Sequence, residues 1–224
     1  MEVSSDFNFK ITKITRQNFD DFKNDKFDIL INTAMPSKKY WSLKNPYLDF
    51  QQSVGLTAEL VFNWKFDKLI HISTISVNEI ESKHPYHINK KVAEIMASCA
   101  NSLVVRLGAI YGMGLKKGAL FDLLNSNKLY VDINSEYNFI STHFVSKWIF
   151  SNIDRNGIVE LGARDTISLL DITKTLDLNV ESGERFERIF SSKIENDMPS
   201  AKEVLQFAKN YMKFFRKKKT NKLI

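Results

Sequence analysis

A tyrosine and a lysine four residues apart, Tyr86 and Lys90, are the side chains of this sequence best suited to proton transfer. On a helix, residues i and i+4 share one face, so the phenol and the ammonium would point into the same crevice. A neighbouring cation favours the phenolate, which lowers the tyrosine pKa and prepares the phenol for proton exchange. Many amphipathic helices meet this spacing by chance, so an ordinary helix surface is the alternative interpretation.

Two hydroxyls end the apolar run that precedes this pair. The run extends from Leu69 to Thr74 and is typical of a β-strand, with Ser73 and Thr74 at its carboxyl end. In open α/β sheets, ligands bind in the crevice outside the carboxyl ends of the strands. Thr74 is therefore a candidate to hold a substrate oxygen. The alternative is a strand-end hydroxyl that bonds only to the backbone.

Apolar runs of strand length alternate with helical patterns along most of the chain. This order predicts an α/β fold, with a parallel sheet and helices on both of its faces. Pro46 suits the first turn of a helix, and Ser168 and Ser200 suit helix N-termini. The expected strands are residues 9–14, 27–31, 69–72, 103–107 and 158–161, and the helices that we expect include 17–23, 46–64, 90–100 and 201–224.

Composition indicates an ordinary globular protein. The chain has 224 residues, of which 43% are hydrophobic and 26% are charged. No apolar run reaches the roughly 18 residues of a membrane span, and the N-terminus lacks the pattern of a signal peptide, so we expect a cytoplasmic protein. The single cysteine, Cys99, excludes an internal disulfide framework and is expected in the core. No metal site is predicted, because the histidines lack ligand spacing.

The C-terminal part differs from the rest of the chain. We expect residues 1–180 to form the main domain and residues 181–224 to form a loop and a basic C-terminal helix. The basic cluster at 213–222 accounts for most of the net charge of +6. A solvated terminus is the preferred interpretation, although such a cluster could touch anionic lipid or nucleic acid electrostatically. No specific nucleic-acid partner is expected.

An ordered series of motifs carries a family resemblance. The residues from Asp28 to Ala34 look like a strand with an Asn-x-Ala turn, and those from Ile70 to Val77 like the next strand, with Thr74 at a catalytic Ser/Thr position. Tyr86 and Lys90 follow, and then a strand with a Tyr-Gly-Met-Gly turn. In this order, residues 27 to about 177 resemble the extended short-chain dehydrogenase/reductase superfamily, specifically its NAD-dependent epimerase/dehydratase group.

The resemblance implies a Rossmann-like sheet with a small C-terminal substrate lobe, and a role for each matched residue. Tyr86 would be the general acid/base, and Lys90 would lower its pKa and hold the nicotinamide ribose. Thr74 would hydrogen-bond the reacting oxygen. The implied cofactor is NAD or NADP, and its crevice would be lined by Asn32, Thr33, Ala34, Tyr86 and Lys90.

Several positions depart from the family pattern. The family opens with a glycine-rich strand-turn-helix, whereas the first glycine here is Gly55, so the fold is expected to be N-terminally truncated. Ser53 and Ala109 stand where the family has asparagines. Tyr137 replaces an arginine that contacts a substrate diphosphate, and His143 with Phe144 replaces paired acids.

Two classes of function are therefore open. The first is an NAD(P)-dependent oxidoreductase, epimerase or dehydratase that acts on a small sugar-like or sugar-nucleotide substrate. The second is a catalytically silent relative that serves as a binding or assembly partner, for example as a homodimer whose second subunit covers an exposed sheet edge.

Overall fold

The computed structural model describes residues 9–79, 83–125 and 128–220, with side chains up to residue 214. The chain divides into two compact units. The first comprises residues 1–107 and 146–159, and the second comprises 108–145 and 160–224. Residues 181–220 lie in the same unit as residues 108–145.

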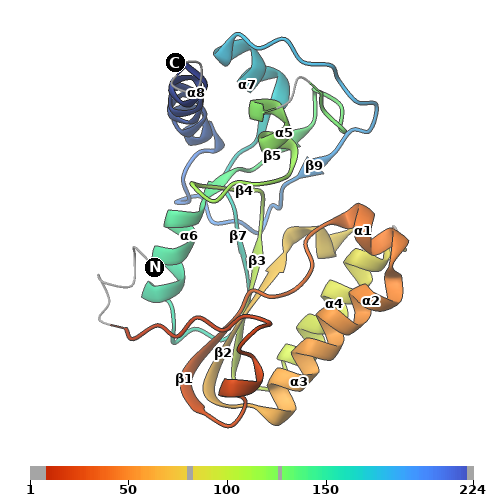
Figure 1. Ribbon diagram of the computed structural model, residues 1–224, viewed down its shortest axis with the longest axis vertical. Coiled ribbons are helices and arrows are strands. Elements are labelled where there is room, and N and C mark those ends of the chain that lie inside the picture. Colours follow the sequence, from red (N-terminus) through yellow and green to blue (C-terminus); the bar gives the residue numbers. More distant parts are fainter. Residues whose placement is uncertain (1–8, 80–82, 126–127, 221–224) are drawn as a thin grey trace. The chain divides into compact units, whose positions relative to one another are not determined.

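The first unit is built on a four-stranded sheet in the order β1-β2-β3-β7 (Figure 1). β1 and β3 both pair in parallel with β2. Leu69, Ile70, Leu103 and Val105 are fully buried, as expected for strands covered on both faces. The strands are β1 (Lys26–Asn32), β2 (Lys65–Thr74), β3 (Ser102–Leu107) and β7 (Gly157–Leu161).

Helices flank this sheet. Figure 1 shows α1 to α4 along one side of the strands and α6, whose residues from Ser146 on belong to this unit, along the other. The helices are α1 (Lys39–Lys44), α2 (Pro46–Phe50), the π-helical turn η3 (Gln51–Gly55), α3 (Leu56–Asn63), α4 (Pro85–Ala97) and α6 (Thr142–Ser151). Pro46 occupies the first turn of α2, as predicted. The α/β class inferred from the sequence is confirmed.

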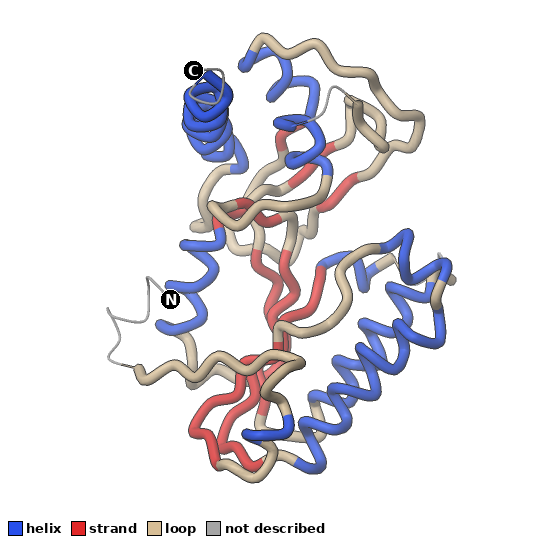
Figure 2. The backbone as a smooth tube through the Cα atoms, in the orientation of Figure 1, coloured by secondary structure: helices blue, strands red, loops and turns tan. Residues whose placement is uncertain are grey.

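The segment before β1 differs from the prediction. Residues 9–15 form no strand, and only the 3-10 turn η2 (Asp20–Phe22) occupies the expected helix at 17–23 (Figure 2). The apolar side chains of this segment pack individually against other parts of the chain instead. Phe9 stacks on Phe150 at 5.4 Å between ring centroids, and Ile14 packs against the cluster around Trp64. Alternating apolar residues favour a strand only where a neighbouring strand pairs with them.

The second unit has short strands around its own core. β4 (Ile110–Tyr111) pairs with β6 (Ile140–Ser141), and a second small sheet has the order β8-β5-β9. The other elements are β5 (Glu136–Tyr137), β8 (Ile167–Ser168), β9 (Arg188–Ile189), α5 (Ala119–Asn125), α7 (Leu169–Leu176), the 3-10 turn η6 (Ala201–Glu203) and α8 (Val204–Thr220). Ser168 caps α7, as predicted, by accepting the backbone N–H of Asp171 at 3.0 Å.

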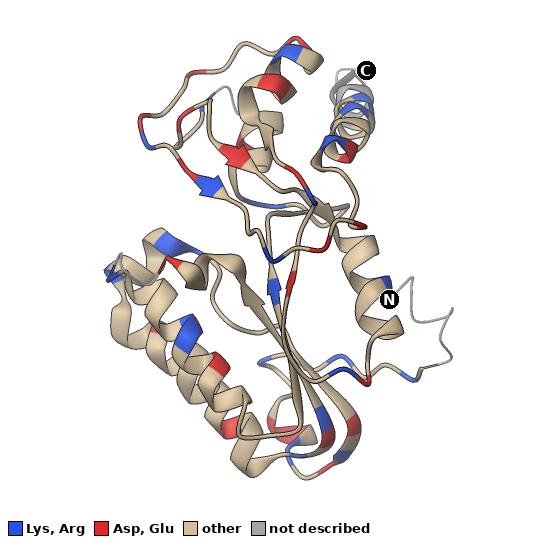
Figure 3. Ribbon diagram, turned by 180° about the vertical axis from the view of Figure 1, so that it is seen from behind, with Lys and Arg blue, Asp and Glu red and all other residues tan. Residues whose placement is uncertain are grey.

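The C-terminal helix α8 belongs to this core. Val204, Ala208 and Tyr211 are buried in the main cluster of the second unit, which confirms the predicted apolar face of the helix. Ser200 caps the preceding turn by accepting the backbone N–H of Lys202. The side chains of the basic cluster from residue 215 on lie outside the described residues. Figure 3 shows basic and acidic residues interspersed along the described helices and strands.

Two further expectations can be compared with the structure. Cys99 is exposed rather than in the core, because α4 ends at Ala97 and the chain turns before β3. None of the described helices combines the length and the hydropathy that a membrane-spanning segment requires.

Candidate functional site

Helix α4 presents the predicted proton-transfer pair. Pro85 occupies its first turn, and the ring of His84 caps it by accepting the backbone N–H of Tyr86 at 3.2 Å. Tyr86 and Lys90 are 7% and 4% exposed, and Nζ of Lys90 lies 5.5 Å from the centroid of the Tyr86 ring. The phenol and the ammonium therefore lie on one buried face of α4, as their spacing predicts.

Thr74 is the last residue of β2. Its Oγ1 accepts the backbone N–H of Ser76 at 3.2 Å and thereby caps the 3-10 turn η4 (Ile75–Asn78). This is the backbone role that the sequence left open as the alternative. A hydroxyl that accepts one bond still has its own proton to donate, so the capping bond leaves Thr74 able to hydrogen-bond a second oxygen.

The turn after β1 lines a cavity of about 540 Å³. Asn32 is buried at the end of the strand, and its Oδ1 accepts the backbone N–H of Ala34 at 3.1 Å, which forms the predicted Asn-x-Ala turn. Thr33 lies between them and also lines the cavity. All three predicted cofactor-crevice residues of this turn thus belong to one cavity wall.

The other walls of this cavity come from the N-terminal segment and from the helical run after Pro46. Phe19 packs on Trp64 at 4.7 Å between ring centroids, and both rings line the cavity. A polar pair lies on the lining as well, because Nη2 of Arg16 donates to Oε1 of Gln52 at 3.3 Å. A mainly apolar lining, a few polar groups and this volume are usual for a small-molecule site. Thr74, Tyr86 and Lys90 are not among the lining residues.

A buried histidine of β2, His71, contacts the polar end of β1. Nδ2 of Asn32 lies 3.3 Å from Nδ1 of His71 and 3.5 Å from Oγ1 of Thr57. Burial and, to a smaller extent, the nearby ammonium of Lys90 together lower the pKa of His71 to about 4. His71 is therefore neutral at physiological pH. The contact with Asn32 is between two strands, and no local pattern of the sequence indicates it.

Tyr137 stands at the position where the resembled family has an arginine, and the structure gives it a core role. Its ring is 3% exposed, and its hydroxyl donates to Oε2 of Glu187 at 2.7 Å. Burial, with the adjacent carboxylate of Glu187, raises the pKa of this phenol far above its ordinary value. At this position the side chain stabilises the second unit internally.

Solved structures show what this fold is similar to. An NAD-dependent NDP-hexosamine 5,6-dehydratase, TunA, involved in tunicamycin biosynthesis, matches with a TM-score of 0.67 at 17% identity, over 87% of this chain and 79% of that one. The UDP-glucuronic acid 4-epimerase of Bacillus cereus, in complex with UDP-glucuronic acid and NAD, matches with a TM-score of 0.67 at 17% identity, over 84% and 76%.

A third structure agrees with these two. The UDP-N-acetylglucosamine 4-epimerase of Methanobrevibacter ruminantium M1 matches with a TM-score of 0.66 at 15% identity, over 88% of this chain and 79% of that one. No protein-family model and no curated protein matches the sequence. The chain therefore has the fold of the NAD-dependent epimerases, dehydratases and reductases of the extended short-chain dehydrogenase/reductase superfamily, as the sequence resemblance implies.

Proposed function

We propose that this chain is an NAD(P)-dependent epimerase, dehydratase or reductase that acts on a sugar or sugar-nucleotide substrate. The observation that carries the proposal is the pair of Tyr86 and Lys90 on one buried face of α4. A phenol and an ammonium held this close are suited to proton transfer, and the structural neighbours are enzymes of this class.

Each residue of the pair has a distinct part in the proposed reaction. Tyr86 exchanges a proton with a substrate hydroxyl or carbonyl. Lys90 favours the phenolate electrostatically, because a cation stabilises a nearby anion most where water is excluded. Thr74 donates the proton of its hydroxyl to the reacting oxygen while it continues to accept the N–H of Ser76.

The residues around the cavity fit part of a nicotinamide cofactor. Asn32, Thr33 and Ala34 would hold the polar portion, and the wall of Phe19 and Trp64 would cover a flat ring. When bound, the cofactor supplies hydride acceptance and donation. The first glycine of the sequence is Gly55, which also lines the cavity. The lining does not distinguish NAD from NADP.

A second candidate function is that of a catalytically silent binding or assembly partner. Within the described residues, β1 pairs with β2 alone, so one edge of the sheet carries no strand. Unpaired edges pair readily with another strand. A second copy of the chain would cover this edge in a homodimer.

The test is a titration of the purified chain with NADH and with NADPH, followed by nicotinamide fluorescence and by thermal shift. Saturable binding that raises the melting temperature supports the enzyme, and the tighter of the two cofactors names the physiological one. A well-folded chain that binds neither overturns the enzyme proposal. A concentration-dependent dimer in that case favours the assembly role.

A further inference from the structure

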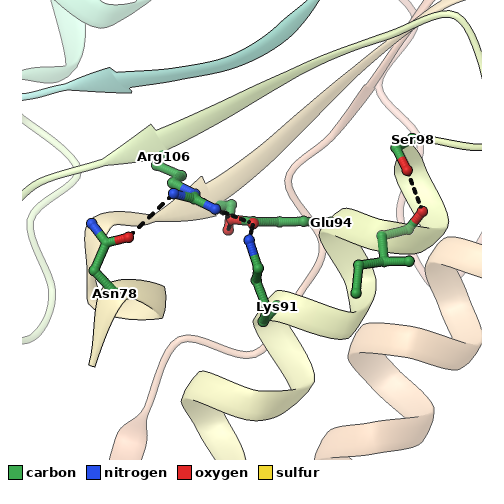
Figure 4. Close-up of polar contacts among 7 residues, drawn as sticks. Asn78, Lys91, Glu94, Ser98 and Arg106 are labelled. Atoms are coloured by element: carbon green, nitrogen blue, oxygen red, sulfur yellow. Dashed lines mark hydrogen bonds and ion pairs between the residues drawn. The ribbon is translucent and has the colours of Figure 1, made fainter. Parts of the chain in front are cut away.

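A buried ion pair joins helix α4 to strand β3. Nε of Arg106 donates to Oε1 of Glu94 at 2.9 Å, and Nη2 donates to Oε2 at 2.7 Å (Figure 4). Both residues are almost fully buried, with exposed fractions of 5% and 2%. Two parallel bonds between a guanidinium and a carboxylate fix the relative orientation of the groups, as well as their distance.

The same pair is tied to the end of β2 and to the turn that follows it. The hydroxyl of Ser73 donates to Oε1 of Glu94 at 2.7 Å, and Nη1 of Arg106 donates to Oδ1 of Asn78 at 3.2 Å. Ser73 immediately precedes Thr74, and Asn78 ends the turn that Thr74 caps. The network therefore attaches to the chain on both sides of Thr74.

Glu94 occupies a special position on α4. It follows Lys90 by four residues and Tyr86 by eight, so the three side chains lie along the same side of the helix. A bidentate anchor on this side resists rotation of the helix about its axis. Such a rotation would swing Tyr86 and Lys90 away from the strand ends.

Stability alone is a weak explanation for such a pair. Removing two charges from water is costly, and well-packed apolar residues of similar size often stabilise a fold as well or better. What an apolar replacement lacks is a directional bond that permits one helix orientation. The buried charges are thus better explained by the geometry that they enforce.

We propose that Glu94 and Arg106 are positioning residues for the Tyr86–Lys90 pair. Through the network with Ser73 and Asn78, they hold α4 in the one rotation that keeps both side chains buried, where little water screens the ammonium of Lys90 from the phenol of Tyr86. This inference rests on the proposed function, because it assigns the network to the same proton-transfer pair.

The experiment follows the ionisation of Tyr86 directly, without a substrate or a cofactor. The chain contains seven tyrosines, so the protein is labelled with ¹³Cζ-tyrosine and the Tyr86 resonance is assigned by its loss in Tyr86→Phe. The midpoint pH of that resonance is then compared in Lys90→Met and in Arg106→Lys. The latter keeps the charge at position 106 but removes the planar fork.

A matched control uses the same substitution in the second unit. Arg164 donates from Nη1 to the backbone carbonyl of Met198 at 2.8 Å, so Arg164→Lys removes a guanidinium bond without touching α4. We expect Lys90→Met to raise the Tyr86 midpoint by about one pH unit, because a cation is lost from its vicinity. Arg106→Lys should raise the midpoint in the same direction, because a helix free to rotate exposes the ammonium of Lys90 to water and weakens its effect on the phenol. Arg164→Lys should leave the midpoint unchanged.

The outcomes separate the inference from the proposed function. If Lys90→Met raises the midpoint and Arg106→Lys only lowers the melting temperature, the network is merely structural and the inference is overturned, while the proton-transfer pair stands. If Lys90→Met has no effect, the pair is not coupled, and both proposals are overturned. If Arg106→Lys does not fold, the midpoint pH of Tyr86 is measured in Ser73→Ala instead. This variant removes one hydrogen bond to Glu94, and the same two outcomes apply.

Discussion

Asn32 and His71 face each other across the parallel pairing of β1 and β2, with Nδ2 of the amide 3.3 Å from Nδ1 of the ring. Because Oδ1 of Asn32 accepts the N–H of Ala34, the amide nitrogen is left to donate to the ring. Nδ1 then accepts, and the single proton of the neutral ring lies on Nε2. Among the described residues, Nε2 has no hydrogen-bond partner. Protonation of Nδ1 would set two donors against each other in a buried site.

This relationship predicts a stability that depends on pH. Burial lowers the pKa of His71 from 6.5 to about 4 in the folded state, so the unfolded chain binds the proton first as the pH falls. Folded stability is therefore full above about pH 6.5 and declines between 6.5 and 4. We expect a loss of about 2 kcal/mol in the free energy of unfolding between about pH 7.5 and pH 5. Urea denaturation at the two pH values measures it.

The matched variants for this test are His71→Phe and His143→Phe. His71→Phe should remove most of the dependence, because the replacement ring cannot take a proton. The ring of His143 is exposed in the second unit, so the stability of His143→Phe should keep the pH dependence of the native chain. An unchanged pH dependence in His71→Phe would show that other groups cause the loss.

Tyr86→Phe should strongly reduce turnover and spare the fold. The substitution removes only the hydroxyl of the proposed acid/base, so we expect turnover of any accepted sugar nucleotide to fall by about 10²-fold or more. The melting temperature and the affinity for the nicotinamide cofactor should change little. Tyr47→Phe, on the exposed surface of α2, is the control and should keep full activity. Nearly full turnover in Tyr86→Phe would refute the assigned chemistry.

Filling the cavity beside Asn32 should block cofactor binding. Gly55 lines the cavity in helical conformation, and an added Cβ there has no neighbouring atom within 4 Å. Gly55→Leu should therefore fold. Its affinity for NADH or NADPH, measured by nicotinamide fluorescence, should fall by at least about tenfold, which corresponds to about 1.4 kcal/mol of lost binding free energy. Gly114 has equally open surroundings in the second unit, and Gly114→Leu should bind normally. Equal binding by the two variants would place the cofactor elsewhere.

The sequence was sufficient to predict an element where its local hydrophobic pattern agrees with its burial in the fold. The runs around Leu69 and Leu103 became central strands, because their β-branched and leucine side chains are buried on both faces of the sheet. Caps and turns at Ser168 and Asn32 were predictable for a related reason, since each depends on a side chain and a backbone group a few residues away.

Contacts between distant residues were not predictable in this way. Residues 9–14 have a strand-like pattern but form no ladder, because pairing depends on a neighbour that local pattern cannot specify. Arg106 lies inside an apolar strand, and only the fold brings it to Glu94 on α4. Cys99 was expected in the core because the expected helix at 90–100 runs three residues beyond the actual end of α4 at Ala97.

The last prediction concerns the second unit. The hydroxyl of Tyr137 donates to the carboxylate of Glu187 at 2.7 Å from a ring that is 3% exposed. Tyr137→Phe removes this bond and leaves the carboxylate to Arg185, whose Nη2 lies 3.6 Å from Oε1. A hydrogen bond to a charged group contributes about 1.5–3 kcal/mol, so we expect a destabilisation of about that size at neutral pH.

The dependence of stability on pH above neutrality provides a second check on Tyr137. Because the folded-state pKa of Tyr137 is raised, its contribution is full below the unfolded pKa of about 10 and is lost as the pH rises further. The stability difference between the native chain and Tyr137→Phe, measured by denaturant unfolding, should therefore shrink above about pH 10. Tyr130→Phe, at an exposed position of the same unit, should match the native chain throughout. Equal stability of Tyr137→Phe and Tyr130→Phe near neutrality would mean that the bond to Glu187 contributes nothing to folding.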